Sequence, residues 1–124
     1  MENWQDKAEF KARVMEWANK LDITVNAISL RQMKNKWASC STNGNLTFDS
    51  ALLDMRKEIG DYVIVHELLH FKVPNHGRLW KSLMQAHLGN YELVEMELGE
   101  FLKSYKPSLE MVSKKRVSKL TSRE

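Results

Sequence analysis

The stretch Asp61-Tyr62-Val63-Ile64-Val65-His66-Glu67-Leu68-Leu69-His70 decides how this chain folds. Its pattern predicts a helix over about residues 56–71 that is apolar on nearly every side, and such a helix must be buried in the core. Pro74 should end it, because proline and the residue before proline both resist helical geometry. The sequence therefore places two histidines and a glutamate inside a central helix.

These three polar residues form the pattern His-Glu-x-x-His. On a helix, His66 and His70 lie one turn apart on the same face, so both imidazoles can reach one metal ion. Glu67 projects toward the same edge, where it can take a proton from a metal-bound water without acting as a ligand. Burying such groups without partners is costly, and a metal ion would satisfy all of them.

A third ligand is expected from the turn after this helix. His76 stands just past the proline, at the spacing found in metzincins, although Val73 occupies the position where those enzymes have glycine. The alternative is an acid on a later helix, as in thermolysin-like enzymes. His76 is preferred over the acidic candidates, which are Glu92, Glu95 and Glu97.

The flanking segments predict an α+β domain. An N-terminal helix is expected over residues 4–20, and a small three-stranded antiparallel sheet follows. The strands at 37–41 and 46–48 are joined by a loop containing Asn43-Gly44, a strong hairpin signal. Further helices are predicted at residues 51–55, capped by Asp49 or Ser50, and from about residue 77 to 89 and 91 to 105.

Composition limits the classes of protein to consider. The 124 residues suit one domain, predicted over residues 1–105. Residues 106–124 carry a net charge of +4, against +3 for the whole chain, and are expected to form a basic, flexible tail. With Cys40 as the only cysteine, no intrachain disulfide is possible. No segment reads as a membrane span or signal peptide, so a cytoplasmic protein with no membrane partner is expected.

Two groups of motifs resemble a known family. The run Arg31-Gln32-Met33-Lys34-Asn35-Lys36-Trp37-Ala38-Ser39-Cys40-Ser41 resembles the R-x-M-K-x-x-W-G-S-C-S signature of YgjP-like metal-dependent hydrolases. The central stretch, with Pro74-Asn75-His76 and Leu79-Trp80, resembles that family's D-Y-V-V-x-H-E-L-x-H, P-N-H and F-W motifs. Ala38 replaces the usual glycine, and Arg56 stands where a proline often opens the helix; neither position is a ligand.

The resemblance implies a minimal zincin-like fold related to the SprT-like and WLM peptidases. It implies one Zn²⁺ per chain, bound by His66, His70 and His76, with Glu67 as general base. The expected function is a zinc-dependent peptidase acting on peptide or protein substrates. Two alternatives remain open: a DNA-associated zinc module whose basic tail binds nucleic acid, and a zinc-stabilised binding domain without turnover. The oligomeric state is not indicated.

Two further expectations concern residues near this site. In zincin folds an edge strand beside the metal-binding helix pairs with extended substrate, and the strand containing Trp37 and Cys40 is a candidate for that role. Their side chains are expected in the core. Arg31 is expected to pair with a buried acid such as Asp61 in preference to binding substrate, and Trp80 to lie in the core beneath the metal site.

Overall fold

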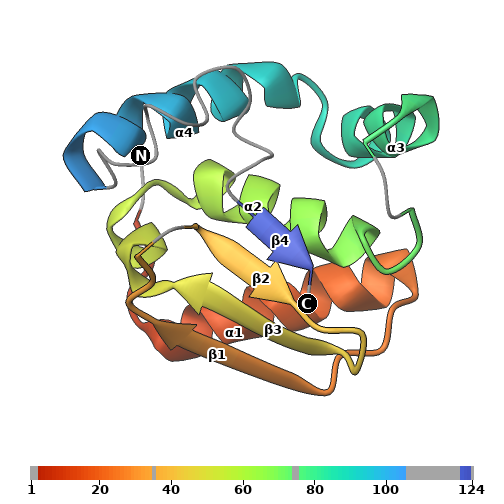
Figure 1. Ribbon diagram of the computed structural model, residues 1–124, viewed down its shortest axis with the longest axis horizontal. Helices are drawn as coiled ribbons and strands as arrows, with labels where there is room; N and C mark the ends of the chain where they lie inside the picture. Colours follow the sequence, from red (N-terminus) through yellow and green to blue (C-terminus); the bar gives the residue numbers. More distant parts are fainter. Residues whose placement is uncertain (1–2, 35, 74–75, 106–120, 124) are drawn as a thin grey trace.

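The computed structural model describes residues 3–34, 36–73, 76–105 and 121–123. It confirms the α+β class and places one helix at the centre (Figure 1). Among the described residues, no helix is long and apolar enough to cross a membrane. The tail predicted over residues 106–124 falls outside these residues except at 121–123, so its flexibility and the domain boundary remain predictions. The helices are α1 Lys7–Leu21, α2 Lys57–Leu69, α3 Arg78–Leu88 and α4 Tyr91–Tyr105.

Helix α2 is the central element that the sequence predicts. It contacts α1, α3, α4 and strand β2 (Ala38–Cys40), and ten of its thirteen residues are buried. Gly60 lets the indole of Trp4 approach closely: a Cβ at this position would lie 2.5 Å from the ring. Each fully buried Val, Ile or Leu contributes about 1.5–3 kcal/mol to stability, so α2 is held by packing on every side.

The sheet differs from the prediction of three antiparallel strands. Strand β3 (Asn45–Asp49) pairs antiparallel with β2, as the Asn-Gly loop predicts, but pairs parallel with β1 (Ala27–Arg31). The order is β1-β3-β2-β4, with β4 (Thr121–Arg123) parallel to β2. Strand β3 lies between β1 and β2, where its Leu46 and Phe48 are 1% and 0% exposed, whereas β1 is more exposed. Strand β3 thus takes an inner position with β1 as its parallel neighbour, and the antiparallel expectation for β1 is wrong.

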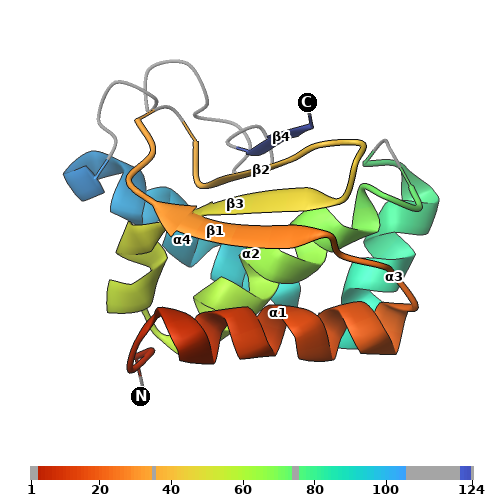
Figure 2. The ribbon, with the colours of Figure 1, turned by 90° about the horizontal axis from the view of Figure 1, so that it is seen from below.

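Two layers result from this arrangement. Helices α1 and α2 lie on one face of the sheet, as Figure 2 shows. The short 3-10 helix η1 (Ser50–Asp54) leads from β3 toward α2, and its N-cap is Asp49, whose side chain accepts a hydrogen bond from the Ala51 N–H at 2.9 Å. The predicted cap is therefore present, and it fixes where the chain leaves the sheet before α2 begins.

Candidate metal centre

Two histidines project from the last turns of α2. His66 and His70 are four residues apart and lie on one face of the helix, with exposed fractions of 0% and 6%. His70 is the C-cap residue, so α2 ends at Leu69, slightly before the predicted end at about residue 71. Their rings meet edge to face, with centroids 4.8 Å apart. The helical spacing therefore delivers two imidazoles to one buried point.

His76 reaches the same point from the segment that precedes α3. Its Nε2 lies 3.1 Å from the Nε2 of His66 and 3.2 Å from that of His70. Three nitrogens around a tetrahedral zinc ion, each at about 2.0–2.1 Å, would stand roughly 3.3 Å apart. The two distances from His76 therefore match the spacing at a shared metal ion, and the ligand atoms of all three histidines lie within 4.8 Å of one another.

Glu67 supplies the second part of the fit. Its side chain is fully buried, and neither carboxylate oxygen accepts a hydrogen bond from the residues that the structure describes. The Nδ1 of His66 lies 3.4 Å from the Oε2 of Glu67. A buried carboxylate without donors is costly. A metal ion and the water it orients would supply the missing charge and donor, so these residues fit such a group.

The acidic residues considered as third ligands lie elsewhere. Glu95 accepts a hydrogen bond from the Tyr62 hydroxyl at 2.7 Å, Glu97 is paired with Arg56, and Glu92 is exposed at a surface cavity. Within the described part of the chain, the only group of three potential ligand residues is the histidine cluster His66, His70 and His76. The structure therefore brings together the histidines and none of these acids.

Aromatic rings surround the histidine cluster. Trp80 of α3 is 2% exposed, as predicted, and meets His76 and His66 edge to face, with centroids 4.6 and 5.3 Å away. Tyr62 lies one turn before His66 on α2 and stacks against it. Burial, and secondarily Glu95, raises the pKa of Tyr62 above its usual range. Tyr62 was not among the residues predicted near this site, although its spacing of four residues from His66 is a visible signal in the sequence.

A second polar cluster lies earlier on α2. The Asp61 carboxylate accepts hydrogen bonds from Arg13 Nε at 2.7 Å, from Arg13 Nη2 at 3.0 Å and from Trp17 Nε1 at 2.9 Å. The hydrogen bond to Asp61 raises the pKa of Arg13. The expected partner, Arg31, is exposed on β1, so that expectation is wrong. Residues 13 and 17 are one turn apart on α1, and this helix packs directly on α2.

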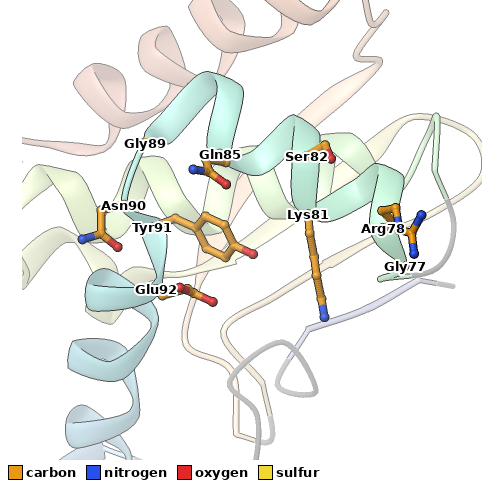
Figure 3. A pocket seen from close by; sticks show the side chains of 9 residues that line it. All are labelled: Gly77, Arg78, Lys81, Ser82, Gln85, Gly89, Asn90, Tyr91 and Glu92. Carbon is orange, nitrogen blue, oxygen red and sulfur yellow. The ribbon is translucent and has the colours of Figure 1, made fainter.

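A cavity of about 750 Å³ lies along α3 and the start of α4 (Figure 3). It begins at Gly77, directly after His76, and its side chains include Arg78, Lys81 and Glu92. Figure 3 shows the side chains of Lys81, from α3, and Tyr91, from the start of α4, among the residues that line it. The cavity therefore offers both cationic and anionic groups beside the segment that carries the third histidine.

Strand β2 occupies the position considered for substrate pairing. It contacts α2, and Trp37 and Cys40 are buried, as expected for core side chains. Its backbone pairs with β3 on one side and with the C-terminal strand β4 on the other, in the register Ala38 with Thr121 and Cys40 with Arg123. The edge of β2 that faces away from β3 can therefore bind an extended segment, and in this structure that segment is β4.

The fold and the converging histidines are those of a metal-dependent hydrolase. Residues 1–101 match the YgjP-like, metallopeptidase domain family, and the chain belongs to that family. This membership confirms the resemblance seen in the motifs and the prediction of a divalent metal ion. No protein of curated function matches the chain significantly.

Two solved structures share the fold. The zymogen of the metallopeptidase abylysin from Pyrococcus abyssi is 20% identical, with a TM-score of 0.66 over 76% of this chain and 95% of that one. The zymogen of jannalysin from Methanocaldococcus jannaschii is 30% identical, with a TM-score of 0.64 over 77% and 96%. The chain thus spans nearly the whole length of two small metallopeptidase zymogens.

Proposed function

We propose that this protein is a zinc-dependent peptidase in which His66, His70 and His76 bind the ion and Glu67 is the general base. One observation carries the proposal. The His76 Nε2 lies 3.1 Å from the His66 Nε2 and 3.2 Å from the His70 Nε2, next to a buried carboxylate that accepts no hydrogen bond from any described residue. A purely structural site needs the histidines but has no use for that carboxylate.

When bound, zinc would act as a Lewis acid toward a water molecule, whose pKa can fall to about 7 in such sites. Glu67 then accepts the water proton as the oxygen–carbon bond forms at the peptide carbonyl. The same carboxyl group donates the proton to the amine nitrogen as the carbon–nitrogen bond breaks.

The proposed substrate is an extended peptide. Backbone groups on the outer edge of β2 supply its hydrogen bonds, in the way that they pair with β4. Such a peptide would take the place of β4, because each backbone group on the edge can serve one neighbouring strand. The strand then positions the substrate beside α2, which β2 contacts.

The substitution Glu67→Gln tests the proposal. It preserves size but removes basicity, so hydrolysis of a casein-type substrate mixture should fall by about 100- to 10,000-fold while zinc content is retained. Glu92→Gln, the same change at an exposed acid, is the matched control and should remain close to wild type. If Glu67→Gln cleaves as fast as wild type, Glu67 is not the base. If the wild-type protein holds zinc but cleaves nothing, the non-catalytic binding domain becomes the better account.

A further inference from the structure

A series of stacked rings connects α4 to the metal-binding histidines. The planes of Tyr91, Tyr62, His66 and His76 follow one another at interplanar angles of 15°, 22° and 10°. The centroid separations are 6.3, 5.9 and 5.0 Å. Four nearly parallel rings in sequence restrict one another's rotation, because each can turn only by displacing its neighbour.

Tyr62 is the fixed member of this series. Its side chain is 2% exposed and lies in the core of the domain. Its hydroxyl donates a hydrogen bond to the Glu95 carboxylate at 2.7 Å, a charge-assisted bond between α2 and α4. The ring is therefore held at both ends: by the backbone of α2 and by a carboxylate from another helix.

His66 is the histidine that this arrangement restrains. It lies one turn after Tyr62 on the same helix and stacks against it, while Trp80 of α3 meets it edge to face. A histidine held in one orientation before the metal arrives loses less conformational freedom on binding. Groups that orient ligands in this way typically change metal affinity by 10- to 100-fold when they are removed.

We infer that Tyr62 is a positioning residue for His66, and that Glu95 on α4 holds Tyr62 in place. The inference rests on the proposed metal site. It also gives Glu95 a role other than that of a ligand: the carboxylate acts through the tyrosine, and α4 thereby becomes part of the metal centre without touching the ion.

The test measures metal affinity and not only activity. Zinc affinity is determined by competition with a chromophoric chelator, and the visible absorption of the Co²⁺-substituted protein reports ligand geometry. Tyr62→Leu removes the ring and should weaken zinc binding by about 10- to 100-fold and alter the Co²⁺ spectrum. Phe10→Leu is the matched control: it removes a fully buried ring that packs on Trp4 and Phe48, so it lowers stability without reaching the histidines.

Two more conservative variants distinguish the contribution of the Tyr62 ring from that of its hydroxyl. Tyr62→Phe keeps the stack and should restore the wild-type Co²⁺ spectrum, with a loss of affinity of about 2- to 10-fold for the missing hydrogen bond. Glu95→Leu should show the same loss, and the double variant should lose no more than either single one. These variants also decide the matter if Tyr62→Leu does not fold.

Three results distinguish the possible failures. If Tyr62→Leu binds zinc as tightly as Phe10→Leu and has the wild-type Co²⁺ spectrum, Tyr62 does not position His66. If Tyr62→Phe and Glu95→Leu both retain wild-type affinity, Glu95 does not hold the ring. If the wild-type protein itself binds neither ion, the proposed metal site is wrong, and the inference fails with it.

Discussion

Helix α2 carries a half-buried acidic residue, Asp61, and a fully buried one, Glu67, and their surroundings are opposite. Asp61 accepts three hydrogen bonds from Arg13 and Trp17, so its charge is compensated within the protein. Glu67 is more deeply buried and accepts none from the described residues. A compensated buried charge indicates a structural tie, whereas an uncompensated one beside three histidines indicates a site that is completed by something bound.

The largest effect on stability should come from metal removal. If the histidine cluster binds zinc only in the folded state, saturation at 100 to 1,000 times the dissociation constant adds about 2.7–4.1 kcal/mol to the free energy of unfolding. Chelation should therefore lower the melting temperature, and added zinc should restore it. Protein shown to have lost its metal but with an unchanged melting curve would mean that the fold does not depend on this cluster.

The substitution Asp61→Asn should lower stability without affecting the proposed metal site, in contrast to changes at that site. It removes the charge that Arg13 and Trp17 bond to, and the loss of charged hydrogen bonds should lower the free energy of unfolding by about 1.5–3 kcal/mol. Zinc content and cleavage rate should remain unchanged at temperatures where the protein is folded. Asp54→Asn, at an exposed position, is the control. Loss of zinc from folded Asp61→Asn would contradict the assignment of Asp61 to structure alone.

The smallest effect concerns the ion pair between Arg56 and Glu97, at the start of α2. Arg56 Nε donates to Glu97 Oε2 at 2.8 Å, and this hydrogen bond lowers the pKa of Glu97. A carboxyl whose pKa is lower in the folded state stabilises the protein above its ordinary pKa of 4.5, and the contribution is lost as pH falls. Because Glu97 is partly exposed, Glu97→Gln should cost at most about 1 kcal/mol at pH 7.

The pH dependence of that variant is the check. In urea unfolding of the metal-free proteins, the difference between Glu97→Gln and wild type should disappear toward pH 3. An equal difference at pH 7 and pH 3 would show that the variant acts through packing and not through charge.

The sequence predicted the histidine cluster better than its surroundings. Helical spacing fixes His66 and His70 on one face, and proline at position 74 of the sequence predicts that the helix ends before His76. Local rules of this kind need only neighbouring residues. The partner of Asp61 could not be read in this way, because Arg13 is 48 residues away and is brought there by the packing of α1 on α2.

The sheet shows the same limit. The Asn-Gly loop predicted the antiparallel pairing of β2 with β3, which is a local feature. The parallel pairing of β1 with β3 joins two strands that β2 separates along the chain, so it is not a feature of neighbouring residues. Strand β4 pairs with β2 although most of the chain lies between them in the sequence, so no local pattern could predict this pairing.

The most direct test of the account is the zinc content of His76→Ala. The two histidines of α2 are placed by one helix, but the centre is complete only if His76 contributes the third nitrogen. Elemental analysis should find one zinc ion per chain in the wild-type protein and in Glu67→Gln, and far less in His76→Ala at equal protein concentration. Full zinc occupancy in His76→Ala would contradict the account and would require another ligand in place of His76.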